Sequence, residues 1–488
     1  MRTLPLFRLV SLACVAALAG CALGPDYSGP PDAAPVAAQS GHFVRGQDTA
    51  SADAPVNRWW EALGDPVLND LVQRALDANP NLGIARARLQ QSRAALSLEQ
   101  ANSLPSVGAS ALAGHARLPP INLGGSSGSS GSSSSSGSSG SSTSLNLYSL
   151  GFDATWEIDL FGGHRRAVQS ATATAEAAEA SLADVQVSLE AEVANAYINL
   201  RDRQRRIQLA DESIRAQEQM ATLTRQRLDR GTASNLDLIR VQNQLDGTRS
   251  DQVPLQADLE SYLNQLATLV GQEPGTLDDM LAAKAAGEMP LPPAQVAVGD
   301  PQTLLRRRPD IRAAERTLAA DTAKIGQAEA ARYPSLKLFG VIGLGGTHPS
   351  DLTKLDDFTA VAAPMLSWNF LDFGRAKARV TQAERVRDEA EMKYRQSVLE
   401  ALRDAEDSLS RFRYGRVTVA TVARTKASAD RALDLAQQRY RAGTGTLIEV
   451  LDTTRQQIAA QQNLSQAEAA LTRSFVGIQK ALGLGWSS

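Results

Sequence analysis

The stretch of sequence that decides the fold is residues 164–230, HRRAVQSATATAEAAEASLADVQVSLEAEVANAYINLRDRQRRIQLADESIRAQEQMATLTRQRLDR. It contains no proline and no glycine, and its apolar and small residues recur at alternating steps of three and four, with one extra step of four. This spacing predicts a single helix with a coiled-coil-like apolar stripe and one stutter. At about 1.5 Å per residue the helix would be about 100 Å long, which is too long for a compact domain.

The chain contains this design twice. Residues 374–441 repeat the long helix, and both helices end in the pattern Arg-x-x-x-Gly-Thr, formed by Arg227, Gly231 and Thr232 and by Arg439, Gly443 and Thr444. Residues up to Ser106, where the first strand begins, recur 229 positions later, as Ser106 does at Ser335. Residues from Trp156, in the second strand, onward recur 212 positions later, as Trp156 does at Trp368. The first copy therefore contains 17 additional residues between its two strands. A nearly pure Ser/Gly tract at 124–144 lies there, as expected of a flexible, exposed hairpin loop.

The repeat predicts one elongated unit rather than several domains. We expect a leader at 1–20, and then a tether at 21–65 whose end is docked by Trp59 and Trp60. The first copy follows at 66–271, an equatorial linker at 272–299, the second copy at 300–483 and a tail at 484–488. Each copy contains helices, two strands, a long helix, a hairpin and a return helix. In the first copy we expect strands at about 106–117 and 146–160, the long helix at about 164–230 and the return helix at about 234–270. In the second copy we expect strands at about 335–345 and 358–370, the long helix at about 374–441 and the return helix at about 446–482.

The clearest strand is 146–160. From Tyr148 to Leu160 aromatic and aliphatic residues alternate with polar or acidic ones, so one face is apolar and the other polar. A soluble sandwich gives the same pattern. A transmembrane β-barrel, with apolar side chains toward lipid and polar ones toward a wet lumen, gains support from the export signal that precedes the mature chain.

Residues 1–20 have the pattern of an export signal, because Arg2 and Arg8 accompany an apolar run too short to span a bilayer. The run ends in LAGC, which resembles a bacterial lipobox in which Cys21 is lipidated and becomes the mature N-terminus. An ordinary signal peptide with an incidental cysteine is the disfavoured alternative. The other cysteine, Cys14, leaves with the leader, so the mature chain has no disulfide. By the same resemblance, Ala22 after the cysteine implies the outer membrane.

The charge of the chain gives no support for nucleic-acid binding, and the number of predicted strands requires several chains to form a barrel. The formal net charge is −3, which offers no basic footprint for nucleic acid. In lipid, strands cross only as a closed barrel, and four strands per chain cannot close one. Dimers would give eight strands with a filled interior and trimers twelve strands with room for a pore; symmetry alone does not choose between them.

At this point the chain resembles the outer-membrane factor (TolC-like) family, in particular its lipoprotein branch serving resistance-nodulation-division (RND) efflux pumps. The resemblance covers essentially all of 21–486. Besides the two hairpins it rests on CALGPDY at 21–27, WWE at 59–61, WEIDLFG at 156–162, RRPDI at 307–311 and KALGLGW at 480–486.

The resemblance implies a mainly helical homotrimer in which a 12-stranded outer-membrane β-barrel, four strands per chain, continues into a 12-helix periplasmic α-barrel. It implies a lipid-anchored, passive exit duct for drugs or other small toxic compounds. The implied partners are a periplasmic adaptor (membrane-fusion) protein, an inner-membrane RND transporter and outer-membrane lipid.

The resemblance also implies where the gate lies, at hairpins 228–236 and 440–448. Glu449 and Asp452 match positions of acidic rings at the constriction, and Asp237 lies on the corresponding helix of the first copy. An acid near a helix N-terminus is also an ordinary dipole partner; both interpretations stay open for Asp452, and the dipole is preferred for Asp237. Tyr440 matches a position that helps hold the tip closed. Gly445 stands where some members carry an arginine, so the clasp built on that arginine is not expected.

The two hairpin motifs are also the expected docking sites for the adaptor, formed by Arg227, Gly231, Thr232, Arg439, Gly443 and Thr444. Their glycines are expected to take left-handed conformations that close the long helices. Trp156 and Trp368 are expected at the periplasmic end of the barrel as interface aromatics, with core packing as the competing interpretation.

Enzyme chemistry has little support. The four histidines are scattered with no pair at ligand spacing, and no phosphate loop or metal motif occurs, so we expect no catalytic residue, metal or cofactor. Two alternatives to the efflux duct remain. A duct for type I protein secretion shares the fold, and a surface-displayed trimeric fibre or adhesin would contain no barrel.

Overall fold

The computed structural model describes residues 22–46, 50–51, 56–118, 143–282 and 289–486. The predicted leader, Cys21 and all but the last two residues of the Ser/Gly tract lie outside this range. The chain forms two compact units. The sheet unit contains the residues up to Gly29, Ser92–Thr174 and Ala319–Glu389, and the helical unit contains Pro30–Gln91, Ala175–Leu318 and the residues from Ala390 onward.

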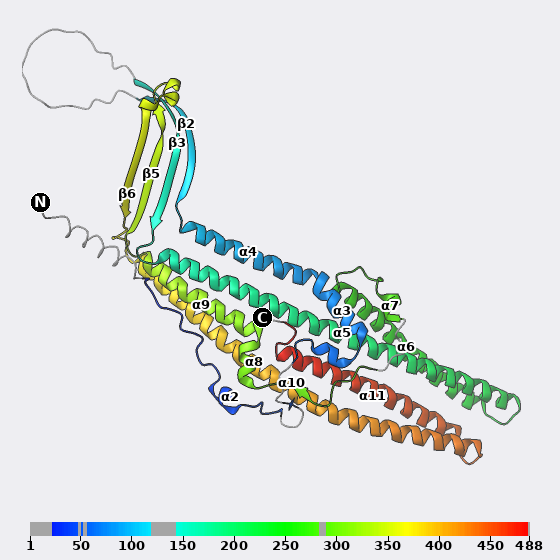
Figure 1. Ribbon diagram of the computed structural model, residues 1–488. Coiled ribbons are helices and arrows are strands. Elements are labelled where there is room, and N and C mark those ends of the chain that lie inside the picture. Colours follow the sequence, from blue (N-terminus) through cyan, green and yellow to red (C-terminus); the bar gives the residue numbers. More distant parts are fainter. Residues whose placement is uncertain (1–21, 47–49, 52–55, 119–142, 283–288, 487–488) are drawn as a thin grey trace, which may run out of the picture. The chain divides into compact units, whose positions relative to one another are not determined.

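The sheet unit is built on one antiparallel sheet with the strand order β2-β3-β5-β6 (Figure 1). Two short 3₁₀ helices, Pro349–Thr353 and Leu355–Asp357, connect the third strand to the fourth. Within this sheet, β2 and β6 each pair with a described strand on one side only. The strands are β2 (Ser106–Leu118), β3 (Thr143–Ile158), β5 (Ser335–Gly346) and β6 (Phe358–Ser367).

The register turns the alternation seen in the sequence into a continuous apolar face. Phe152 pairs with Ala109 on one side and with Ile342 on the other, and Ile342 pairs with Ala360. Because successive residues of a strand point to opposite sides of the sheet, one face is apolar across all four strands. The large side chains of this face that are exposed in the single chain include Val107, Leu150, Phe152, Ile342 and Phe358.

The opposite face is polar along β3, where Asp153, Thr155 and Glu157 alternate with the apolar residues. Glu157 is paired with Lys337 of β5, and their charged groups are 3.2 Å apart. The two faces of β3 therefore differ in polarity, as the sequence predicts.

Strands β3 and β5 approach closely where two glycines face each other. Gly151 pairs with Gly343, and a Cβ atom at either position would lie 2.6 Å from a carbonyl oxygen of the neighbouring strand. Only glycine fits such an approach.

The predicted strand over 146–160 ends early. The strand stops at Ile158, because the carboxylate of Asp159 turns to accept a hydrogen bond from the backbone N–H of Arg165 at 2.9 Å in the first turn of the next helix. β6 likewise stops at Ser367 rather than at residue 370. Pro364, which cannot donate to a strand ladder, lies in β6, an edge strand within this chain.

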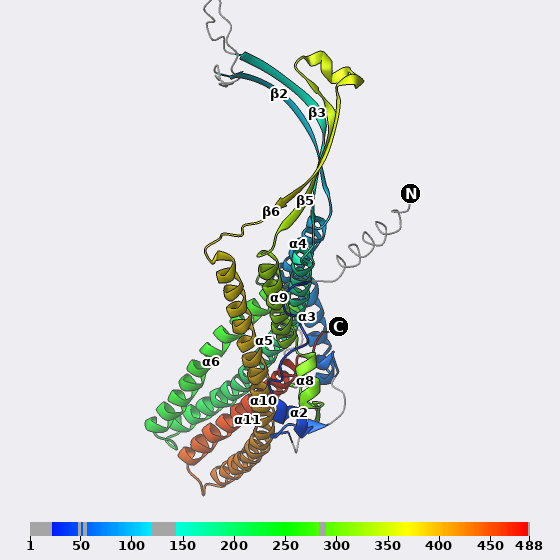
Figure 2. The same cartoon turned by 90° about the vertical axis from the view of Figure 1, so that its left-hand side faces the viewer.

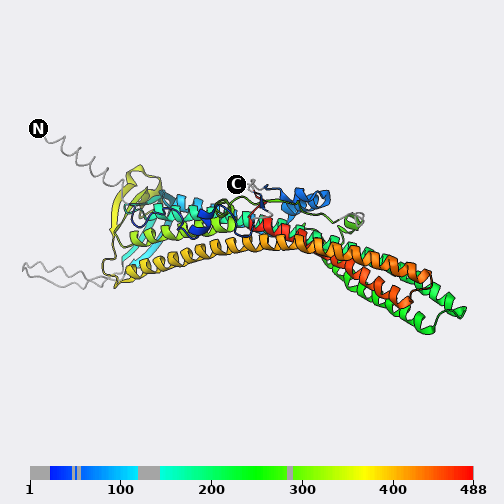
Figure 3. The same cartoon turned by 90° about the horizontal axis from the view of Figure 1, so that it is seen from below.

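The long helices are α5 (Gly163–Asp229) and α10 (Arg375–Arg441), each of 67 residues. Each is followed by a return helix of 35 residues, α6 (Asn235–Leu269) or α11 (Leu447–Ala481). In Figures 2 and 3, α6 runs back beside α5 and α11 beside α10. The remaining long helices and the shorter ones are α3 (Pro66–Ala78), α4 (Pro80–Asn102), α7 (Asp278–Ala282), α8 (Pro301–Arg307) and α9 (Pro309–Ala330). Among the described residues, no helix is both long and apolar enough to cross a bilayer.

The core of the helical unit is aromatic and aliphatic. Trp59 and Trp60 are buried, with their rings edge to face at 5.7 Å, and Trp59 also contacts the ring of Phe475 at 6.2 Å. Asp65 caps the N-terminus of α3 and accepts a hydrogen bond from the hydroxyl of Tyr197 at 2.6 Å. Trp59 of the WWE motif therefore packs against α11, and Asp65, at the start of α3, is bound to α5.

The two return helices end in the same way. The side-chain amide of Asn79 donates to the carbonyl of Leu269 at 2.8 Å, and the guanidinium of Arg308 donates to the carbonyl of Ala481 at 2.8 Å. Each donor precedes a proline that starts a helix, and each acceptor is the last residue of its return helix. This contact gives the RRPDI motif a structural role.

The N-terminal segment, expected to be an extended tether because it shows no periodicity, is not extended throughout. Pro35–Ser40 form the short helix α2, and Phe43 is buried. Both carboxylate oxygens of Glu406 accept backbone N–H groups, from Val44 at 2.8 Å and Arg45 at 2.9 Å. The two-residue strand β1 (Ala50–Ser51) pairs in parallel with β4 (Val296–Ala297). Composition without periodicity gave no sign of these contacts, because they are made by partners distant in sequence.

Candidate functional site: the two helical hairpins

Both long helices close on a glycine. Gly231 and Gly443 have φ angles of 71° and 76°, the left-handed conformation predicted for them. The backbone N–H of Thr232 donates to the carbonyl of Arg227 at 2.8 Å, and that of Thr444 donates to the carbonyl of Arg439 at 3.0 Å. Each threonine hydroxyl also donates to the same carbonyl. The Arg-x-x-x-Gly-Thr pattern is therefore a helix-closing motif in both copies.

Asp237 serves the helix that follows the first hairpin. The side chain of Ser234 accepts from the backbone N–H of Asp237, and the Asp237 carboxylate accepts from the Ser234 N–H at 3.1 Å and hydroxyl at 2.7 Å. This reciprocal capping box starts α6. The Ser234 hydrogen bonds lower the pKa of Asp237. The preferred interpretation of Asp237 as a helix-start residue thus has a full set of contacts.

Glu449 occupies the corresponding position of the second hairpin but is used differently. Its backbone N–H donates to the hydroxyl of Thr446 at 3.2 Å, while its carboxylate receives the guanidinium of Arg439 at 2.6 Å. Asp452, one turn further along α11, accepts from Arg455 at 2.7 Å and from Gln456 at 2.8 Å. Both acids stay partly exposed, and their described partners are side chains of the same hairpin region.

The two hairpins are joined by a contact between Arg227 and Tyr440. The guanidinium of Arg227, at the end of α5, donates to the hydroxyl of Tyr440, at the end of α10, and lies 5.1 Å from the centre of its ring. The hydrogen bond and the cation–π contact together form what we call the Arg227–Tyr440 clasp. The sequence singled out both residues but did not pair them.

The backbone is tightly packed at Gly445, the position where an arginine is implied for some members of the resembling family. A Cβ atom at this position would lie 3.1 Å from the Cβ of Arg439 and 3.1 Å from the backbone N of Tyr440. The chain packs tightly after the second hairpin, so a larger side chain requires the end of α10 to shift. The Arg227–Tyr440 clasp supplies an inter-hairpin contact without it.

The two predicted interface tryptophans belong to the sheet unit and make equivalent contacts. The indole N–H of Trp156 donates to the carbonyl of Ser103, and that of Trp368 donates to the carbonyl of Arg332, both at 3.1 Å. Both rings are partly exposed, 39% for Trp156 and 56% for Trp368, so neither is a core residue within this chain.

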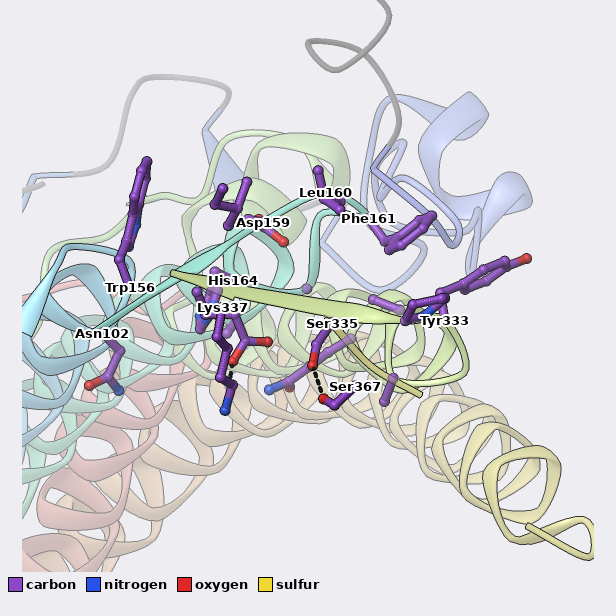
Figure 4. Close-up of a pocket in the computed structure, with 18 of the residues that line it drawn as sticks. Asn102, Trp156, Asp159, Leu160, Phe161, His164, Tyr333, Ser335, Lys337 and Ser367 are labelled. Carbon is purple, nitrogen blue, oxygen red and sulfur yellow. Dashed lines mark hydrogen bonds and ion pairs between the residues drawn. The ribbon is translucent and has the colours of Figure 1, made fainter. Parts of the chain in front are cut away.

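A cavity of about 720 Å³ lies at the base of the sheet, and Figure 4 shows Trp156 beside it. Lys337 and Glu157 form an ion pair in it, and the hydroxyls of Ser335 and Ser367 are 2.8 Å apart. Its lining is mixed in polarity and contains no grouping that suggests a catalytic site. Among the described residues, no group of His, Cys, Asp and Glu side chains is arranged to hold a metal ion.

Among the charged residues of α5 that are buried, Arg166 and Glu190 were not singled out from the sequence. Arg166 binds backbone carbonyls of the N-terminal segment, and Glu190 lies in the core beside Trp59. One signal was available for Arg166: at the offset of 212 its counterpart is Ala378, so the two copies differ there. Cys21 lies outside the described residues.

Three comparisons agree with this architecture. The family model described as outer membrane efflux protein matches residues 111–272 and 301–484. Nodulation protein T of Rhizobium leguminosarum bv. viciae is 28% identical over 99% of this chain and 94% of its own, and the toluene efflux pump outer membrane protein TtgC of Pseudomonas putida is 31% identical over 98% and 96%. The solved structure of the outer-membrane channel OprN has a TM-score of 0.86 and 33% identity, covering 96% of this chain and all of that one.

Proposed function

The chain belongs to the outer membrane efflux protein family, and from that premise we propose that three copies form the exit duct of an outer-membrane efflux pump. The relatives that are named for a transport process are efflux or export proteins of the outer membrane, which supports efflux rather than type I protein secretion. The duct conducts passively and performs no chemical reaction. Its cargo is small toxic compounds, the class that the names of the toluene and antibiotic efflux relatives indicate.

The observation that carries the proposal is the sheet. One face is apolar across all four strands, with large side chains exposed, and the outer sides of β2 and β6 have no partner among the described strands. In a bilayer every backbone polar group requires a partner, so such a sheet must close. Neighbours in the sheet are antiparallel, hence β6 of one copy meets β2 of the next in the same antiparallel sense. Three copies then give a 12-stranded barrel with its apolar face toward lipid.

The helices continue the duct on the periplasmic side. Two helices of 67 residues, at about 1.5 Å per residue, are each about 100 Å long. The equal lengths of the long helices and of the return helices, and the matched ends at Asn79 and Arg308, support an internal duplication, with copies at 66–271 and 300–483 and an equatorial linker at 272–299. A trimer would place twelve helices around a water-filled axis.

The two hairpins form the gate and the docking site for a periplasmic adaptor protein, which connects the duct to an inner-membrane RND transporter. In the closed state the Arg227–Tyr440 clasp holds α5 to α10. Glu449 and Asp452, repeated by the three-fold axis, give the constriction a negative potential that attracts cations. Acylation of Cys21 adds a lipid anchor; several acyl chains hold a protein to a membrane firmly.

Two measurements test the proposal. The full-length protein, extracted in detergent, is expected to be a heat-modifiable trimer that conducts ions in planar bilayers, and a strain lacking it is expected to be hypersusceptible to toxic compounds. A monomer without conductance would refute the duct.

The gate residues have their own test. The double variant Glu449→Gln/Asp452→Asn is expected to lose cation selectivity, whereas Asp237→Asn, at the position equivalent to Glu449, is expected to keep it. Unchanged selectivity of the double variant would remove the two acids from the gate.

A further inference from the structure

A buried side chain of α5 binds the N-terminal segment directly after Cys21. The guanidinium of Arg166 donates to the carbonyl of Leu23 at 2.9 Å, to the carbonyl of Gly24 at 3.0 Å and to the carboxylate of Asp26 at 2.7 Å. It also donates to Gln169 at 3.0 Å. The Arg166 side chain is only 4% exposed, so its charge depends on these partners.

The backbone of the segment is packed against the backbone of the sheet unit. A Cβ atom at Gly24 would lie 2.8 Å from the backbone N of Gly326, and one at Gly162 would lie 2.7 Å from the Cα of Ala22. Gly24 and Gly162 have φ angles of 85° and 78°. The N–H of Leu23 donates to the carbonyl of Phe161 at 3.2 Å. The segment therefore sits in a fitted cradle.

Comparison of the two copies of the module provides an internal control. At the same offsets, Arg166 corresponds to Ala378 and Gly326 corresponds to Ser97, so neither the guanidinium nor the close approach is needed for the module itself. Gly374, the counterpart of Gly162, has open space where a Cβ atom would lie. Arg166 and Gly326 thus have no equivalent in the other copy, whereas the left-handed glycine at 162 is kept as Gly374. Arg166 and Gly326 are therefore the residues of the cradle that serve Ala22–Asp26.

We propose that Arg166 and the glycine cradle position the acyl anchor of Cys21 relative to the base of the sheet, so that the lipid and the barrel enter the membrane in a fixed relation. Consecutive Cα atoms lie about 3.8 Å apart, so fixing Ala22 limits where acyl chains on Cys21 leave the protein. Arg166 is a positioning residue, and the ligand of the cradle is the chain's own lipidated N-terminus. This inference rests on the acylation of Cys21 in the proposed function.

A double-mutant cycle on the full-length protein tests the inference. Arg166→Ala is expected to lower the amount of heat-modifiable trimer in the outer membrane at least fivefold when Cys21 is acylated. In a Cys21→Ser protein exported by a non-lipoprotein leader, the same substitution is expected to change it less than twofold. Arg166→Lys is expected to resemble Arg166→Ala, because an ammonium cannot bridge the carbonyls and the carboxylate as a planar fork does. Arg165→Ala, at the exposed neighbouring position, is the matched control.

A spin label at Ser28→Cys provides a readout that does not depend on assembly. Its mobility is expected to rise in Arg166→Ala and to stay unchanged in Arg165→Ala. Equal trimer losses with and without acylation, or an immobile label in Arg166→Ala, would overturn the positioning role while leaving the duct intact. A mass measurement that finds Cys21 unacylated in the wild-type protein would overturn both the lipid anchor of the proposed function and this inference.

Discussion

Replacing Tyr440 with phenylalanine removes a single hydrogen bond from the Arg227–Tyr440 clasp and leaves the ring in place. The guanidinium of Arg227 then keeps its position 5.1 Å from the ring centre but loses the hydroxyl as acceptor. Because the clasp is an inter-hairpin contact of the proposed gate, its loss is expected to favour the open state.

The size of the effect follows from exposure and symmetry. A hydrogen bond to a charged donor contributes about 1.5–3 kcal/mol, and the solvent exposure of Arg227 reduces this to about 0.5–1 kcal/mol. Three clasps that break in one opening step add to about 1.5–3 kcal/mol. This is a shift of about 10- to 150-fold in the ratio of closed to open channels.

Single-channel recording in planar bilayers measures this ratio directly. Tyr440→Phe is expected to raise the open probability by the stated factor, and Arg227→Ala, which also removes the cation–π contact, by more. Tyr414→Phe is the matched control, since Tyr414 carries its own cation–π contact, from Arg413 at 4.9 Å, far from the hairpins in sequence. If Tyr440→Phe opens the channel no more often than Tyr414→Phe does, the clasp is not part of the gate.

Two further predictions concern the barrel and the core. Gly343→Ala places a Cβ atom 2.6 Å from a carbonyl oxygen of β3, so it is expected to destabilise the sheet by about 1–3 kcal/mol and to reduce the yield of heat-modifiable trimer. The control Gly340→Ala, whose Cβ would have its nearest atom at 3.8 Å, is expected to assemble normally. Equal trimer yields for the two variants would contradict the close approach. Burial raises the pKa of Glu190 from 4.5 to about 9, against the opposing effect of Trp59. The contribution of Glu190 to stability is therefore fully present below about pH 4.5 and is lost as the pH rises toward 9, by up to about 1.4 kcal/mol per unit. Glu190→Gln is expected to remove this slope in a pH series of unfolding midpoints, and parallel slopes for the two proteins would show that the carboxyl is not held neutral.

Local rules allowed the helices to be predicted closely from the sequence. The long helix expected over about 164–230 is observed at Gly163–Asp229, and the one expected over 374–441 at Arg375–Arg441. Helical periodicity acts within a few residues, as does the lack of Pro and Gly in 164–230, so no tertiary information was needed. The strand expected over 146–160 was extended two residues too far, because apolar alternation does not reveal that Asp159 caps the following helix.

The candidate site was predicted only as a set of positions. The sequence identified both hairpins and their left-handed glycines, since helix closure is local. It did not predict that Arg227 contacts Tyr440 while its counterpart Arg439 contacts Glu449. The two arginines stand in the same local pattern, so their different partners follow from the residues that the neighbouring helices bring within reach.

The sequence by itself determined the lengths of the helices, the polarity of the strands and the closure of the hairpins, because each depends on residues a few positions apart along one element. Only the tertiary structure decided that the N-terminal segment is docked rather than loose, and which acid caps a helix and which pairs with an arginine. Those outcomes depend on burial and on distances between elements far apart in the chain, where a guanidinium such as that of Arg166 takes whichever carbonyls the fold presents to it.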